Sequence, residues 1–305
     1  MEEVNPRLNS VTGGLTYSVA VIIFIAVSLI ISLIISFAHL EEGGNAYVYL
    51  SYIASPIAIG ACIASVLAYR KINFRCIFPV KCSPKYYVIG LLLIYGLLFS
   101  LSWLNDVSVK FFRLFGYVPR ESESYFPDVK GGMIVPALLV IAVLPAFIEE
   151  LLFRGAVLNS CENSMGSIRA IFIAGFCFSL FHGSPEQTVY QFVAGCAFAF
   201  IAVRSRSILP SVMMHFINNA LIVILYACNC YDETGALIIT DGGNIALTVT
   251  SAIAFVGAVL WLVFDKTPLK KCEKGGVKSF FVYASVGIAV LGLMWLLSLF
   301  GVGNA

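Results

Sequence analysis

Charge is scarce in this sequence. Only 12% of its 305 residues are charged, whereas soluble domains carry about a quarter. Apolar residues make up 60% of the chain, and the mean hydropathy is +0.93. The small net charge of +2 says little about partners, and we expect no nucleic-acid partner. The composition therefore excludes an ordinary soluble domain and predicts a lipid bilayer as the main partner.

Cysteine pairs of the CxxC kind are missing as well. The nine cysteines show no zinc-finger spacing, and most lie in apolar runs, where a free cysteine packs as a small hydrophobe. A cleavable signal peptide is not evident either. The first apolar run, about 15–38, is longer than the apolar part of a signal peptide. We therefore interpret it as a true membrane span.

Long apolar runs recur along the whole chain. A helix needs about 20 apolar residues to cross a bilayer, and it satisfies its own backbone groups in lipid. The sequence therefore predicts an all-α, polytopic transmembrane helical bundle of about eight or nine spans, the sixth of them short. The nine candidates are about 15–38, 46–69, 86–104, 132–153, 166–183, 188–203, 208–228, 244–264 and 279–300.

We divide this single membrane domain into three parts. Residues 1–131 hold the N-terminal helices and a long connector, residues 132–228 hold a central helical core, and residues 229–305 hold the C-terminal helices. The connector, about 105–131, contains Phe111, Phe112, Leu114 and Phe115. These side chains favour either an amphipathic piece lying on the membrane or an ordinary ordered connector.

Lysine and arginine alternate between the predicted loops. If the N-terminus is cytoplasmic, the cationic loops all fall on the cytoplasmic side, as the positive-inside rule requires. Three of the four opposite loops carry no Lys or Arg, and the exception is the 105–131 connector. We therefore predict a multi-pass protein of the cell membrane, of the bacterial plasma membrane type. The inner cations are Arg70, Lys71, Arg75, Lys81, Lys85, Arg169, Arg204, Arg206, Lys266, Lys270, Lys271, Lys274 and Lys278.

Ionisable residues inside membrane spans are costly and indicate function. The first such segment is Glu149-Glu150-Leu-Leu-Phe-Arg154. Residues four apart share a helix face, so Glu150 is expected to pair with Arg154. Glu149 is turned about 100° away and is left for chemistry. Read alone, the segment could also be the charged end of a span.

Two further segments carry polar groups. Phe178 and His182 share one helix face, and so do His215 and Asn219, whereas Asn218 points elsewhere. Each pair alone could be structural. Together, a Glu, two His and an Asn on three helices can converge in a bundle core. A glutamate can then act as a general base on water, and His and Asn can donate to an oxyanion.

These three motifs, in this order, resemble those of the CAAX prenyl protease 2 and bacteriocin-processing (CPBP, or Abi) family. The resemblance covers roughly 132–225 and implies an all-helical intramembrane endopeptidase. It implies as substrate a membrane-associated peptide or a lipidated, in some members prenylated, protein. It also implies that Glu149 and His182 activate water and that His215 and Asn219 hold the oxyanion. Glu150, Arg154 and Phe178 would then support the site.

Two other functions remain open at this point. A proton-coupled transporter could use Glu149 and the histidines as a relay, although we see no inverted repeat or pair of broken helices. A non-catalytic bacteriocin-immunity or scaffold protein could keep the motif residues for packing. For the enzyme, we expect a site without a bound cofactor. Zinc held by Glu149, His182 and His215 is the alternative, disfavoured because Glu150 is expected to be committed to Arg154 rather than to a histidine.

Depth in the membrane poses one difficulty. With the spans as drawn, Glu149 lies near the inner end of the fourth span and His182 near the outer end of the fifth. We therefore expect the fourth span to continue to about Ser160 and the fifth to run past Gly183.

Overall fold

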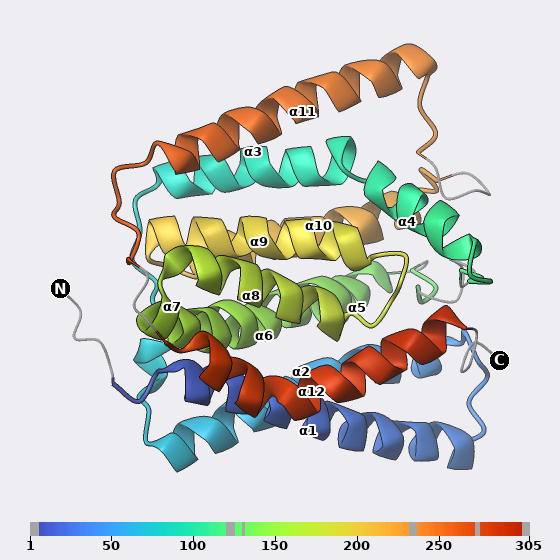
Figure 1. Cartoon of the computed structure of the whole chain (residues 1–305). Helices are drawn as coiled ribbons and strands as arrows, with labels where there is room; N and C mark the ends of the chain where they lie inside the picture. Colours follow the sequence, from blue (N-terminus) through green and yellow to red (C-terminus); the bar gives the residue numbers. More distant parts are fainter. Residues whose placement is uncertain (1–5, 120–125, 130–131, 232–236, 272–274, 301–305) are drawn as a thin grey trace.

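The computed structural model describes residues 6–119, 126–129, 132–231, 237–271 and 275–300. Within these residues the fold is a bundle of helices that run back and forth between two ends (Figure 1), which confirms the all-α prediction. No named strand occurs in the described part, where Tyr231 and Leu237 form an isolated bridge. The long helices are α1 (Ser10–Phe37), α2 (Asn45–Arg70), α3 (Lys85–Ser100), α9 (Thr188–Ser205), α10 (Leu209–Ala227), α11 (Asp241–Val263) and α12 (Val277–Leu299).

Every predicted span coincides with a helix. By length and composition, seven helical segments of the described chain can cross a membrane, or eight if α3 and the following α4 (Trp103–Arg113), bent by 41°, form one span. The remaining apolar helix is α8 (Ser167–Phe181), with 15 residues. The sixth predicted span, α9, is short as expected, with 18 residues, and the fifth, α8, is shorter still. The expectation that the fifth span runs past Gly183 is wrong, because α8 ends at Phe181.

The fourth span is much longer than drawn from the sequence. It runs over the 32 residues of Ile134–Met165, which confirms the expected continuation to about Ser160 and extends past it. Two π-helical stretches, η3 and η4, interrupt its α-helical hydrogen bonding, and π-helical turns frequently mark functional sites. Its parts are α5 (Ile134–Ala137), η3 (Leu138–Val143), α6 (Leu144–Glu150), η4 (Leu151–Leu158) and α7 (Asn159–Met165).

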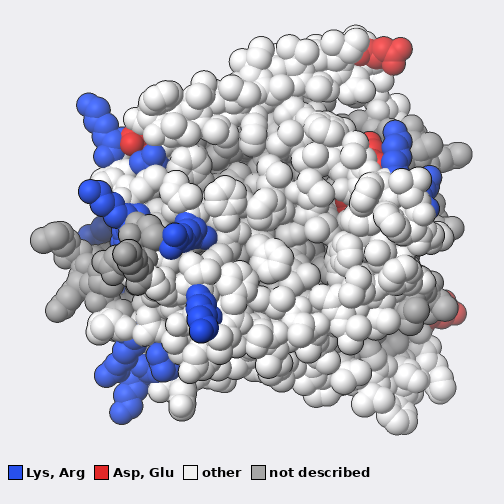
Figure 2. Space-filling model, in the orientation of Figure 1, with Lys and Arg blue, Asp and Glu red and all other residues white. Residues whose placement is uncertain are grey.

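Lysine and arginine gather at one end of the bundle (Figure 2), where α1 begins and α2 ends (Figure 1). We call this the cationic end. All the inner cations predicted from the sequence belong to segments at this end, except Lys274, which lies outside the described residues. The opposite end carries α4, with Lys110 and Arg113. Which end faces the cytoplasm stays a prediction.

The connector contains the helix α4 at the end opposite the cationic end. Phe111, Leu114 and Phe115 are exposed, as expected of an apolar face turned toward lipid. Phe112 points the other way and packs edge-on against Trp295 of α12, with ring centroids 5.4 Å apart. The connector is therefore both amphipathic and anchored to the bundle.

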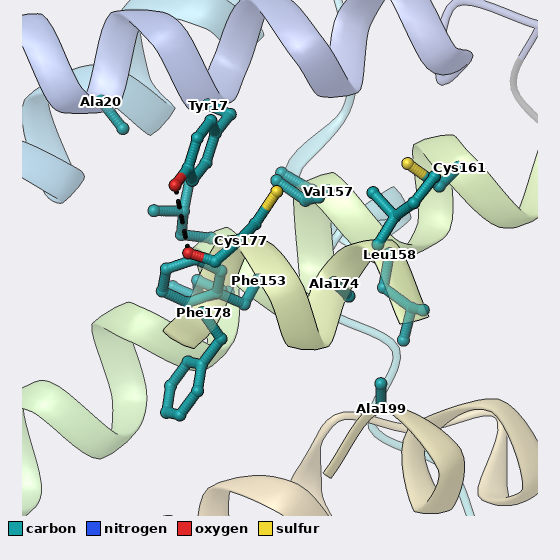
Figure 3. Close-up of a cluster of buried hydrophobic side chains, with 14 of the residues drawn as sticks. Tyr17, Ala20, Phe153, Val157, Leu158, Cys161, Ala174, Cys177, Phe178 and Ala199 are labelled. Atoms are coloured by element: carbon teal, nitrogen blue, oxygen red, sulfur yellow. Dashed lines mark hydrogen bonds between the residues drawn. The ribbon is translucent and has the colours of Figure 1, made fainter. Parts of the chain in front are cut away.

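Small residues bring the central helices into close contact. A Cβ atom on Gly175 of α8 would lie 2.5 Å from the sulfur of Cys196 in α9, and one on Gly195 would lie 2.9 Å from the Cα of Gly175. Such close approach is common between membrane helices. The core beside this crossing joins α1, η4, α8 and α9 (Figure 3), and within it the Tyr17 hydroxyl donates to the Cys177 carbonyl at 3.2 Å. The two glycines therefore allow α8 and α9 to pack closely against each other.

Candidate active site

Glu149 and Glu150 lie at the end of α6, between the two π-helical stretches. Because successive residues of a helix are about 100° apart, their side chains enter different surroundings. The Glu150 side chain is fully buried, whereas 12% of the Glu149 side chain is exposed. The structure therefore separates the two carboxylates as the sequence predicted, and Glu149 is the one that keeps some exposure.

Glu150 and Arg154 form the expected pair one helical turn apart. Arg154 Nη1 donates to Glu150 Oε1 at 2.6 Å, and both side chains are completely buried. Arg154 Nη2 donates to the Gly195 carbonyl at 3.1 Å. The guanidinium lies near three aromatic rings, with its Cζ 4.6 Å from the Phe178 centroid, 5.1 Å from Phe198 and 5.9 Å from Phe153. Ring faces attract cations, so this aromatic surround replaces much of the hydration that Arg154 lacks.

His215 of α10 connects the two glutamates. Its Nδ1 lies 3.1 Å from Glu150 Oε1, and its Nε2 lies 4.0 Å from Glu149 Oε2. An ionised carboxylate only accepts hydrogen bonds, so Nδ1 carries a hydrogen and donates to Glu150. In the neutral ring Nε2 then holds the lone pair and faces Glu149. His215 can therefore donate to an oxyanion through Nε2 only when it carries a second proton.

His182 follows the last residue of α8. Its Nδ1 lies 2.9 Å from the Phe178 carbonyl oxygen, which can only accept, so Nδ1 is the donor and Nε2 is left available. The Phe178 ring contacts both histidines, with centroids 4.5 Å from His182 and 5.9 Å from His215. Phe178 thus supports the site in three ways: through its carbonyl, through its ring contacts with the histidines, and through its ring beside Arg154.

The depth of His182 and Glu149 agrees because α7 and α8 are joined by a single turn residue, Gly166, with φ +84°. Glu149 lies 166 − 149 = 17 residues before this glycine, and His182 lies 182 − 166 = 16 residues after it. At a helical rise of 1.5 Å per residue, both lie about 24 Å from the turn. The expected difference in depth between Glu149 and His182 is therefore absent, because the fourth span is longer than the predicted 132–153. The fifth span does not need to be extended.

Asn219 is held at both ends of its amide. Its Nδ2 donates to the Ile141 carbonyl at 3.0 Å, and its Oδ1 accepts from Asn218 Nδ2 at 3.0 Å. A side-chain amide has two N–H groups, so one remains for another acceptor. Helix geometry alone places Asn218 on another face, yet its hydrogen bond to Asn219 Oδ1 fixes the orientation of the Asn219 amide.

Sequence reasoning missed four contributors besides Asn218: the carbonyls of Gly195 and Ile141 and the rings of Phe153 and Phe198. Backbone carbonyls leave no trace in residue type. Gly195 carries one signal, because a glycine inside an apolar membrane helix often marks a close helix crossing. The two phenylalanines are indistinguishable from the other 22 in the sequence.

The fit of a metal can be judged from the donors present. Glu149, His182 and His215 are all described, yet no group of three or more His, Cys, Asp or Glu in the described chain comes together so as to hold a metal ion. One sequence argument against zinc is nevertheless wrong. Glu150 is not committed to Arg154 alone, because the same Oε1 also accepts from His215 Nδ1, as a carboxylate behind a ligating histidine does.

Comparison with known proteins identifies the segment that carries this site. Residues 131–221 match the family model described as type II CAAX prenyl endopeptidase Rce1-like. The chain is also 23% identical over 115 residues to the "Putative membrane peptidase YdiL" of Bacillus subtilis (strain 168). That alignment covers 37% of this chain and 47% of the relative, so the match spans about half of the relative's length.

No solved structure matches the chain. The matched residues 131–221 include all seven motif residues assigned from the sequence, from Glu149 to Asn219. The helical fold adds several apolar segments able to cross a bilayer, which supports a multi-pass membrane protein. The family model and the relative together support the assignment of this segment to the CPBP family, that of the CAAX prenyl endopeptidases.

Proposed function

We propose that this protein is an intramembrane endopeptidase of the CAAX-protease type, with Glu149 as the general base. The observation that carries the proposal is the placement of Glu149 Oε2 4.0 Å from His215 Nε2, while Glu150 holds the other ring nitrogen. A gap of 4.0 Å is too long for a direct hydrogen bond. A water molecule to one side of the line that joins the two atoms can hydrogen-bond to both, and in this proposal that water is the nucleophile.

The reaction is a hydrolysis in which Glu149 moves one proton. The carboxylate takes a proton from the water as the water oxygen bonds to the scissile carbonyl carbon. The negative charge that develops on the carbonyl oxygen is held by the remaining N–H of Asn219. His215 Nε2 carries no proton and accepts a hydrogen bond from the attacking water. The C–N bond then breaks, and the proton on Glu149 passes to the leaving amine. His182 Nε2 shares that proton with Glu149.

The depth of the site indicates the substrate class. Glu149 and His182 lie about 24 Å of helix from the Gly166 turn, within the apolar part of the bundle. A soluble protein does not reach this depth in its folded form. We therefore propose a membrane-associated peptide or a lipidated protein, including a prenylated one, as the substrate.

We also propose that the reaction proceeds without zinc, because Asn219 supplies a neutral donor for the oxyanion. Elemental analysis of active, purified protein tests this. About one zinc per chain, with activity lost to a chelator and restored by zinc, would overturn the metal-free mechanism.

Comparative peptidomics tests the function itself. Membranes containing the protein are compared with membranes containing Glu149→Gln at the same level. Because a general base contributes about 10²–10⁴-fold, we expect cleavage products that depend on the protein and vanish with Glu149→Gln, while the variant inserts normally. Identical peptide profiles would reject the peptidase and leave the transporter and the non-catalytic scaffold.

The proposed orientation places the cationic end in the cytoplasm. Ser83 is exposed in the loop between α2 and α3 at that end. On a protein with its native cysteines replaced, a cysteine introduced by Ser83→Cys should react only with membrane-permeant thiol reagents in intact cells. Labelling by an impermeant reagent from outside would reverse the topology.

A further inference from the structure

We propose that Pro145 is a positioning residue for Asn219, acting through the carbonyl group of Ile141. The proposal rests on the proposed function, in which Asn219 holds the oxyanion. Pro145 lies four residues before Glu149, at the second position of α6. It belongs to none of the three sequence motifs.

The inference begins with the hydrogen bond that Pro145 cannot make. In an α-helix the carbonyl of residue i accepts from the N–H of residue i+4, and the N–H that would serve Ile141 belongs to residue 145. Proline has no N–H. The hydrogen-bonding register changes at the same place, since the Leu144 N–H bonds five residues back to Leu139 and α-helical bonding resumes in α6. Pro145 thus removes the α-helical donor for Ile141.

A carbonyl without a partner is costly inside a membrane, and prolines are tolerated there where a neighbouring helix supplies the missing donor. Here that donor is Asn219 Nδ2 of α10, at 3.0 Å from Ile141 O. A carbonyl can only accept, so this bond fixes which end of the Asn219 amide faces Ile141. The amide oxygen then faces Asn218 Nδ2.

The consequence concerns the second N–H of Asn219. With one N–H on Ile141 and the oxygen on Asn218, the amide plane is fixed, and the remaining N–H has one direction in which to point. Restoring a backbone N–H at position 145 offers Ile141 its intrahelical donor again. Asn219 then loses the acceptor that holds it.

The test is Pro145→Ala, measured alone and combined with Asn219→Ala. We expect Pro145→Ala to lower kcat about tenfold to a hundredfold with little change in KM, as a displaced oxyanion donor does. On the Asn219→Ala background it should have no further effect, because residues that act through one another are not additive. An unchanged kcat in Pro145→Ala, or an equal loss in both backgrounds, would overturn the proposal.

A second measurement does not depend on catalysis. The side-chain amide resonance of Asn219, assigned by its absence in Asn219→Ala, should shift and exchange faster with solvent in Pro145→Ala. Pro56, buried inside α2, provides the matched control, and Pro56→Ala should leave the resonance in place. An Asn219 amide unaffected by Pro145→Ala rejects the positioning contact. An altered amide in a protein whose Asn219→Ala variant stays fully active confirms the contact and rejects the proposed function of Asn219.

Discussion

Glu150 and Glu162 lie on the same helical segment and each pairs with an arginine, but their surroundings differ. Around Glu150, both members of the pair are fully buried. Around Glu162, the carboxylate is 4% exposed, while Arg206 and Lys270, its partners at 3.1 and 3.2 Å, are 38% and 36% exposed. Ser167 adds a hydrogen bond to Glu162 at 2.6 Å.

The difference shows what each cluster does. At the cationic end, the cations keep contact with water and Glu162 has several partners, so the cluster ties α7 to the loops before α10 and α12 with redundancy. At the site, Arg154 and His215 both donate to the same oxygen, Glu150 Oε1. Neither side chain is exposed enough to bind water in place of this carboxylate. The contacts of Glu150 therefore orient the side chains of the site, whereas the contacts of Glu162 hold segments of the chain together.

The largest effect on stability is expected from Glu150→Gln. It leaves Arg154 charged and buried without its counter-ion, and removing one member of a buried pair costs about 3–5 kcal/mol. Thermal unfolding in detergent, followed by intrinsic fluorescence, measures the loss.

The matched control is Glu149→Gln, one residue away and partly exposed, which should unfold near the wild-type temperature. A Glu150→Gln protein that is stable but inert, beside a Glu149→Gln protein that is active, would show that the two carboxylates exchange the assigned roles.

A smaller effect is expected from Glu162→Gln. Its amide oxygen can still accept from Ser167 and Arg206, and both cations can turn to water, so we expect a loss of about 1–2 kcal/mol. The same unfolding measurement compares it with Glu150→Gln. Equal losses at the two positions would remove the contrast between the site and the cationic end.

These same residues show which features of the fold and the site can be predicted from the sequence. The Glu150–Arg154 pair follows from helical spacing alone, and the helices that coincide with the nine predicted spans follow from apolar length. The contact between His215 and Glu150 does not, because it depends on the axial register of α10 against α6. The end of α8 at Phe181, by contrast, agrees with Gly183 and Pro185, two helix-ending residues that follow the apolar run. The bond from Asn219 to Ile141 requires knowing which carbonyl the proline releases and which helix lies beside it.

The stability of the cationic end should also depend on pH, because Asp265, which follows α11, is an ionised carboxylate held there by hydrogen bonds. Although burial raises the pKa of Asp265, hydrogen bonds from Lys85, Thr267 and Tyr86 outweigh it and hold the pKa below its usual value. A lowered carboxyl pKa stabilises the fold above the unfolded-state value, near 3.9. That stabilisation is lost as the pH falls toward the lowered pKa.

We therefore expect the unfolding temperature of the wild type to fall more steeply below about pH 4 than that of Asp265→Asn. Parallel curves for the two proteins would show that Asp265 contributes nothing to the pH dependence.

The smallest effect is expected from Lys270→Met, at the edge of the Glu162 cluster. Lys270 Nζ lies 3.2 Å from Glu162 Oε2 and donates to Asn163 Oδ1 at 2.7 Å, but over a third of its side chain is exposed. Exposed ion pairs contribute about 0–1 kcal/mol, and Glu162 keeps Arg206 and Ser167 when Lys270 is removed. Methionine retains most of the apolar stem, so the variant tests the charge alone. A loss comparable to that of Glu150→Gln would mean that the cationic end depends on one ion pair as strictly as the site does, and the redundancy inferred for it would be wrong.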